Sequence, residues 1–197
     1  AYKEGTFRDV SSKDWYAEGV ATAYELGLMK GNGRLFSPSG SVTLAEAITM
    51  AARLHSRYTT GKDAFVQGSP WYQVYVDYAE DNGILAKNEF ADVTVSATRG
   101  QMTHIFASAL PAEELQAINT VTKLPDVSTD TQYVEDIFLL YRAGVLTGND
   151  AKGTFTPNAT IQRSQAAAII ARMALPELRK TLNLQSTEAK LSDAVQP

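Results

Sequence analysis

The chain of 197 residues contains no cysteine, which excludes disulfides, thiolate metal sites and cysteine nucleophiles. It also lacks any apolar run near the ~18–20 residues of a membrane-spanning helix, so no membrane insertion is expected. The first five residues, AYKEG, lack the apolar core of a signal peptide, so either export is absent or the signal has been removed. What remains is a soluble, globular protein.

An excess of positive charge is also missing. Lysine and arginine number 18 against 22 aspartate and glutamate residues, which leaves a net charge of −4. This balance gives no overall attraction to nucleic acid or to an anionic membrane, so no nucleic-acid partner is expected. Any anionic ligand must therefore be captured by local geometry.

Catalytic motifs are missing as well. The two histidines, His55 and His104, lack metal-ligand spacing, and neither Gly-x-Ser-x-Gly nor His-Glu-x-x-His occurs. Carboxylates are plentiful, but nothing in the sequence nominates a glycosidase pair. The sequence therefore predicts a protein that is not an enzyme, with no cofactor and no metal, and with both histidines as ordinary surface or boundary residues.

What the chain does contain is a threefold repeat with enough apolar residues, 44%, for a substantial core. Each segment has a helix ending near a glycine, then a loop, then a second apolar helix. The recurring positions are the aromatic pairs Trp15-Tyr16 and Trp71-Tyr72, replaced by Gln132-Tyr133 in the third segment, and the glycines Gly27, Gly83 and Gly144. Units of this size cannot bury their apolar faces alone, so they should share a core.

We therefore predict a mainly α fold of three helix–loop–helix repeats in one compact module. Repeat one spans residues 1–60, repeat two 61–118 and repeat three 119–176, followed by a C-terminal helix and polar tail at 177–197. The first helix is expected over 15–29, and residues 56–69 are expected to form a polar linker.

The second helix of each repeat opens with a related motif: Thr43-Leu44-Ala45-Glu46, Thr98-Arg99-Gly100-Gln101 and Gln162-Arg163-Ser164-Gln165. A threonine followed three residues later by Glu or Gln is a capping box, which marks a helix start. An arginine in the first turn, where free backbone N–H groups also point outward, is a receptor for a carboxylate or phosphate. Leu44 breaks the pattern in the first repeat.

Together these motifs resemble the S-layer homology family over roughly residues 6–175. The resemblance implies a largely helical module with pseudo-threefold symmetry that holds exported bacterial proteins non-covalently to the cell wall. It further implies a pyruvylated secondary cell-wall polysaccharide as ligand, with Arg99 and Arg163 meeting the pyruvyl carboxylate of an N-acetylmannosamine unit in grooves between repeats. An extracellular location on the bacterial surface follows, with surface-layer proteins as further candidate partners.

Other residues are also candidates for ligand binding, and each of them has a structural interpretation as well. Trp15 and Trp71 would either line a sugar site or pack in the core. Gln101 and Gln165 are mainly capping residues with a smaller claim to ligand contact. The three recurrent glycines would allow close approach of ligand or end a helix. The pair Asp9 and Asp126 would cap turns or bond a sugar hydroxyl.

Two functions from different classes remain open. The first is anchoring through glycan binding. Against it stands the simpler interpretation that each arginine is merely solvated at its helix start. The second is a protein–protein interaction or surface-assembly module that has lost glycan binding, which Leu44 and the altered loop of repeat two would favour.

Overall fold

The computed structural model describes residues 1–184 and is mainly helical, which confirms the predicted fold class. The described part of the chain contains no β-sheet, and no helix in it is long and apolar enough to span a membrane. Its elements are α1 (Ala17–Glu25), α2 (Leu44–Thr60), α3 (Gln73–Asp81), α4 (Arg99–Ala107), η1 (Ala112–Glu114), α5 (Val134–Arg142), α6 (Arg163–Ala174) and η2 (Pro176–Leu178).

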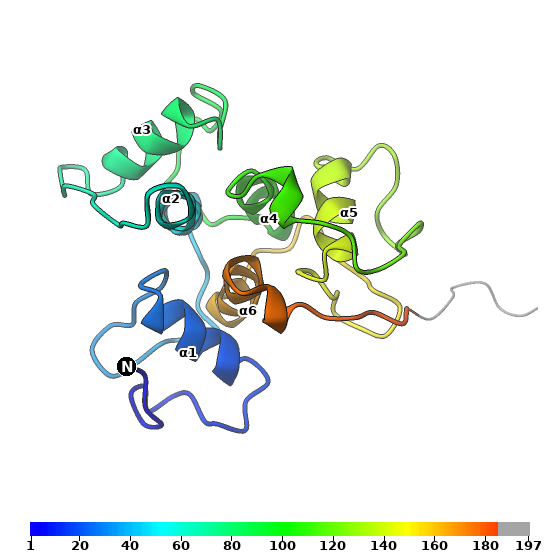
Figure 1. Ribbon diagram of the computed structural model, residues 1–197, viewed down its shortest axis with the longest axis horizontal. Coiled ribbons are helices and arrows are strands. Elements are labelled where there is room, and N and C mark those ends of the chain that lie inside the picture. Colours follow the sequence, from blue (N-terminus) through cyan, green and yellow to red (C-terminus); the bar gives the residue numbers. More distant parts are fainter. Residues whose placement is uncertain (185–197) are drawn as a thin grey trace, which may run out of the picture.

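The helices pair between units, not within them. The second helices α2, α4 and α6 lie around the centre, and α1, α3 and α5 lie outside them (Figure 1). Helix α3 packs on α2 and α5 packs on α4, so each outer helix covers the inner helix of the preceding unit. The ring closes because α1, from the first unit, packs on α6, from the last. The boundaries of the repeats at residues 60 and 118 stay a prediction.

The inner helices form because their apolar residues recur at helical spacing and point to the centre. The predicted core face of α2, consisting of Ala47, Met50, Ala51 and Leu54, is buried. The corresponding residues that follow Thr98 and Gln162 are buried too: Met102, Ile105, Phe106, Ala109, Ala166, Ile169, Ile170 and Met173. All of them belong to a single hydrophobic core cluster that also takes in residues of the outer helices, so the units share one core.

Three predicted segments differ from the structure. The first helix covers only Ala17–Glu25 of the expected range 15–29. Helix α2 continues to Thr60 and ends at Gly61, whose φ of 69° is left-handed, so the first part of the predicted linker, residues 56–60, is helical. The helix expected after Pro176 is reduced to the 3-10 turn η2. The predicted polar tail at 185–197 lies outside the described residues.

A cyclic set of backbone hydrogen bonds joins the three units at the starts of their inner helices. The N–H of Val42 donates to the carbonyl of Ile161 (3.3 Å), the N–H of Ile161 donates to Ala97 (3.0 Å), and the N–H of Ala97 donates to Val42 (2.7 Å). All three side chains are fully buried. These bonds fix the segments that lead into α2, α4 and α6 relative to one another.

The closure between α1 and α6 depends on Gly19. A Cβ atom at this position would lie 2.7 Å from the Ala168 Cα, so only glycine permits the observed helix separation.

Gly19→Ala should lower the free energy of unfolding by about 1–3 kcal/mol, the usual cost of overpacking, even though alanine favours helices. Urea unfolding would measure the change. Gly68→Ala is the matched control, because nothing lies within 4 Å of a Cβ there. Equal stability of the two variants would contradict the close packing.

Candidate functional site

The backbone N–H groups at the starts of the inner helices are not free, which corrects the expectation that they would bind an anion. In α4, the N–H of Arg99 donates to the carbonyl of Ala159 (2.8 Å) and that of Gly100 to Pro157 (2.9 Å). The next N–H, of Gln101, donates to the Thr98 hydroxyl (3.1 Å). Loops of other units supply equivalent carbonyls at the starts of α2 and α6. Helix dipoles are thus satisfied by protein, and any anion must be bound by side chains.

Arg99 is held by the loop that precedes α6. Its Nε donates to the carbonyl of Phe155 (2.7 Å), and its guanidinium lies 5.0 Å from the centre of the Phe155 ring. The residue is only 5% exposed, and burial lowers the pKa of its guanidinium, which nevertheless stays charged at neutral pH. Within residues 1–184 its two terminal nitrogens have no hydrogen-bond partner. The fork of the guanidinium is therefore available to a ligand.

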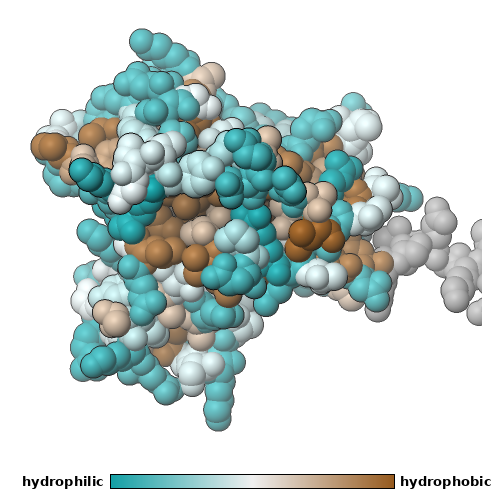
Figure 2. Space-filling model, in the orientation of Figure 1, coloured by the Kyte–Doolittle hydropathy of each residue, from teal (hydrophilic) through white to brown (hydrophobic). Residues whose placement is uncertain are grey.

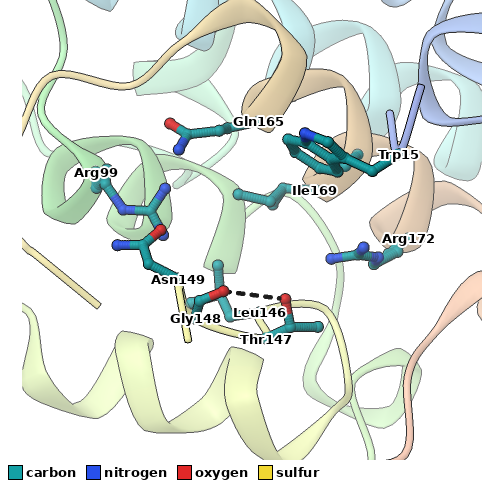
Figure 3. A pocket seen from close by; sticks show the side chains of 10 residues that line it. Trp15, Arg99, Leu146, Thr147, Gly148, Asn149, Gln165, Ile169 and Arg172 are labelled. Carbon is teal, nitrogen blue, oxygen red and sulfur yellow. Dashed lines mark hydrogen bonds between the residues drawn. The ribbon is translucent and has the colours of Figure 1, made fainter. Parts of the chain in front are cut away.

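These terminal nitrogens border a groove of about 340 Å³ that brings all three units together. Figure 3 shows Arg99 and Trp15 on opposite sides of it, with Ile169 between them and Arg172 near the tryptophan. We call this groove one. Its lining consists of Trp15, Arg99, Leu146, Thr147, Gly148, Asn149, Gln165, Ala168, Ile169 and Arg172.

A second groove, groove two, has a related construction and a volume of about 310 Å³. Trp71, Arg163 and Arg53 take the places that Trp15, Arg99 and Arg172 have in groove one. The remaining lining residues are Leu28, Met29, Lys30, Glu46, Thr49, Met50, Gln67 and Tyr75. The two tryptophans are 66% and 46% exposed, so core packing does not account for either of them.

Arg163 is clamped as Arg99 is, but it is also paired. Its Nε donates to the Phe36 carbonyl (2.8 Å), with the guanidinium 4.6 Å from the centre of that ring. Its Nη2 donates to the Lys30 carbonyl (2.6 Å), and its Nη1 lies 3.5 Å from Glu46 Oε2. Burial lowers the pKa of Arg163, and Glu46 acts in the opposite direction. Every nitrogen of this guanidinium therefore has a protein partner.

The interface between units two and three lacks the features of these grooves. Leu44, 2% exposed, takes the place of the arginine, and Gln132 takes that of the tryptophan. His104 lies on α4 where α2 and α6 carry the lining residues Thr49 and Ala168, and its ring stacks on Tyr133 at 4.3 Å. An arginine introduced at position 44 alone would therefore not be expected to create a third groove.

His104 is not the ordinary surface residue that the sequence suggested. Its Nδ1 lies 2.7 Å from Asp136 Oδ2 on α5, and its Nε2 lies 2.6 Å from Glu89 Oε1 in the loop before α4. The hydrogen bond with Asp136, together with Glu89, raises the pKa of His104 against the effect of burial. No signal in the sequence pairs these three residues, which come from separate segments.

The aspartates of the prediction lie outside both grooves and hold the arginine-binding loops. Asp126 accepts hydrogen bonds from the backbone N–H groups of Phe155 (2.9 Å) and Thr156 (2.7 Å). Asp9 does the same for Phe36 and Ser37, both at 2.8 Å. Burial alone would raise the pKa of Asp9, but these N–H donors lower it. Their role is to fix the loop carbonyls that clamp Arg99 and Arg163.

The remaining predicted residues divide between helix ends and groove one. Gly27, Gly83 and Gly144 follow the outer helices with φ of 67°, 72° and 78°, a left-handed backbone that ends a helix, and they line neither groove. Gln101 accepts from the Thr98 N–H (2.9 Å) and is a capping residue. Gln165 caps α6 through the Gln162 N–H (3.1 Å) and also lines groove one.

Sequence reasoning missed the second arginine of each groove, Arg53 and Arg172. Both occupy the same position of an inner helix, where unit two has Ser108, and this recurrence was available as a signal. Arg172 donates from Nη1 to the Val145 carbonyl (3.2 Å), and Arg53 bonds the Gly27 carbonyl and the Tyr75 hydroxyl. The polar residues Thr147 and Asn149 were missed because only the fold brings their loop to α6.

The raised pKa of His104 makes stability depend on pH. Because the folded pKa lies above the unfolded value of about 6.5, the folded state binds the proton more tightly. The stabilisation is full below pH 6.5 and is lost as pH rises through the folded pKa. Urea unfolding of wild type and His104→Gln between pH 5.5 and 9 should show the wild-type advantage shrinking with pH. His55 stays in both proteins, so its lowered pKa cancels in the comparison. If the free energies of unfolding of the two proteins changed in parallel with pH, the interaction of His104 with Asp136 and Glu89 would be contradicted.

Comparison with known proteins finds matches to one domain family. Residues 6–48 and 123–167 match the family model of the S-layer homology domain. The chain is 27% identical over 206 residues to the S-layer protein sap of Bacillus anthracis, covering 97% of this chain and 25% of that protein. It is 26% identical to the S-layer protein of Bacillus thuringiensis subsp. finitimus over the same shares. This chain thus spans about a quarter of the length of these relatives.

Enzymes also match, but over smaller segments. The exoglucanase XynX of Acetivibrio thermocellus is 28% identical over 106 residues, which are 52% of this chain and 9% of that enzyme. S-layer homology domains occur in S-layer proteins and cell-surface glycosidases, where they anchor proteins to the cell wall. This chain is accordingly a cell-surface, wall-associated protein. Its first and third units thus match the S-layer homology domain family, and the second unit repeats their helix–loop–helix architecture.

Proposed function

We propose that this chain anchors a bacterial surface protein by binding a pyruvylated wall polysaccharide in its inter-unit grooves, without catalysing a reaction. The observation that carries the proposal is Arg99, whose guanidinium is clamped at Nε while its terminal nitrogens border a groove with an exposed tryptophan. A buried fork pairs with a carboxylate in bidentate fashion and loses little conformational entropy in doing so.

The shape of groove one suits a sugar that carries a ketal-linked carboxylate. The carboxylate would meet the terminal nitrogens of Arg99, and the apolar face of the ring would rest on Ile169 and Trp15. Thr147, Asn149 and Gln165 offer hydrogen-bonding groups for hydroxyl or acetamido substituents. The two arginines and the absence of carboxylates from this lining favour an acidic ligand in a protein of net negative charge.

The alternative of a protein–protein module rests mainly on the loss of arginine at Leu44. That loss affects one interface, while the other two keep an arginine and a tryptophan. A further hollow of about 250 Å³ lies near the carboxyl ends of the inner helices, on the face that Figure 2 displays, and is lined mainly by apolar residues such as Leu54 and Met173. The two arginines on its lining already have partners: Arg57 lies 3.5 Å from Asp63, and Arg179 donates to three backbone carbonyls. Surface-layer proteins as partners stay a prediction.

Arg99 should account for recognition of the pyruvyl group. Calorimetry with native wall polysaccharide should show Arg99→Lys weakened by about 1.5–3 kcal/mol, because lysine keeps the charge but loses the fork and the Nε bond. Depyruvylated polysaccharide should bind wild type and variant equally weakly. Arg34→Ala, at an exposed arginine outside both grooves, is the control. If native and depyruvylated polymer bound wild type with the same affinity, the pyruvate-specific mechanism would be rejected.

Trp15 should contribute through the sugar ring. Because it is 66% exposed, Trp15→Ala should leave the unfolding midpoint nearly unchanged while weakening binding by about 0.5–1.5 kcal/mol. Trp15→Phe should recover part of this loss, since it keeps an aromatic face. Calorimetry and thermal unfolding measure the two effects separately. A loss of stability without a loss of affinity would assign Trp15 to packing instead.

A further inference from the structure

Groove one and groove two share a construction but differ at one position of the inner helix. The third residue of α6 is Gln165, which is neutral, and the third residue of α2 is Glu46, which is acidic. Both residues cap their helices in the same way, by accepting from the backbone N–H of residue 162 or residue 43. The charge at this position is therefore free to vary without loss of the helix start.

In groove two this charge meets the arginine. Glu46 Oε2 lies 3.5 Å from Arg163 Nη1, and the Lys30 carbonyl accepts from Nη2 at 2.6 Å. A ligand carboxylate would have to displace both partners before it could bind the two terminal nitrogens of Arg163. The second arginine of the groove, Arg53, is similarly engaged by Gly27 and Tyr75, with Asp63 at 3.8 Å from its Nε. Lys30 is a third cation on this lining, beside Arg53 and Arg163.

In groove one the corresponding partners are missing from the described residues. Gln165 lies on the same side of the groove as Arg99 (Figure 3) but carries no charge to compete for it. Thr147 stands where groove two has Lys30, and no carbonyl of residues 1–184 accepts from the terminal nitrogens of Arg99. The lining contains two arginines and no carboxylate. The guanidinium of groove one is thus preorganised and open, whereas that of groove two is preorganised and occupied.

We propose that the two grooves are unequal receptors: groove one binds the carboxylate-bearing sugar tightly, and groove two is held in a low-affinity state by Glu46. This inference rests on the proposed function and assigns the Gln165 and Glu46 position as its affinity-determining residue. The reason is electrostatic and geometric together. A carboxylate already beside the fork repels an incoming carboxylate and fills the site that it would take.

The chain provides its own reporters for a test. It contains two tryptophans, and each groove has one of them on its lining. The indole N–H signals of Trp15 and Trp71 in a nitrogen-15 correlation spectrum therefore follow groove one and groove two separately. Their assignment comes from Trp15→Phe and Trp71→Phe. The probe is a short oligosaccharide released from wall polysaccharide with its pyruvyl ketal intact, and the depyruvylated oligosaccharide is the control.

In wild type, the Trp15 signal should saturate at a ligand concentration at least tenfold below that needed for Trp71. Glu46→Gln should bring the Trp71 response to within about threefold of Trp15. Gln165→Glu should weaken the Trp15 response at least tenfold and leave Trp71 unchanged. Both exchanges are nearly isosteric and keep the helix caps, and thermal unfolding would verify that the fold persists.

The outcomes distinguish failure of this inference from failure of the proposed anchoring function. If both tryptophans of wild type respond to the pyruvylated oligosaccharide at one concentration, the inequality of the grooves is wrong. If Glu46→Gln leaves the Trp71 response unchanged, the assignment of the inequality to Glu46 is wrong. In both cases the anchoring function stands. If neither signal distinguishes the pyruvylated from the depyruvylated oligosaccharide, the carboxylate mechanism fails, and the inference fails with it.

Discussion

The fold depends on the cyclic backbone hydrogen bonds between Val42, Ile161 and Ala97. Each unit donates one bond and accepts one, and all three residues are buried, so a unit that left would strand an N–H and a carbonyl in an apolar interior. The same segments supply the carbonyls that satisfy the starts of the inner helices. Since those segments also carry the loops that clamp Arg99 and Arg163, the geometry of the grooves is set by the bonds that hold the units together.

The clamped arginines show how a packing requirement and a binding capacity are combined. One edge of each guanidinium bonds a loop carbonyl and lies on a phenylalanine ring, which ties an inner helix to the loop of another unit. The other edge faces the groove. Where Leu44 replaces the arginine, this tie is lost, and the stack of His104 on Tyr133 with its two carboxylates bridges that interface. Symmetry of the backbone is thus kept while the chemistry of the three interfaces differs.

Much of the fold follows from local pattern, whereas the pairing of elements does not. Short sequence segments predict the capping boxes at Thr43 and Thr98, the apolar faces of the inner helices and the glycines that end the outer helices. The structure confirms all three features. The candidate arginines and tryptophans were found by recurrence, and the structure brings each pair to one groove. The satisfied helix starts and the Glu46 contact of Arg163 were missed, because they join residues from different units whose relative position no local spacing specifies.

The packing of α1 on α6 gives this repeat protein a property that open arrays lack. In a linear stack the outermost repeats have one neighbour each, so they fray first and give proteases and mechanical load a place to begin. A closed ring has no outermost member. Detaching any unit costs two interfaces at once, and an anchor built in this way should resist stepwise peeling and yield only as a whole.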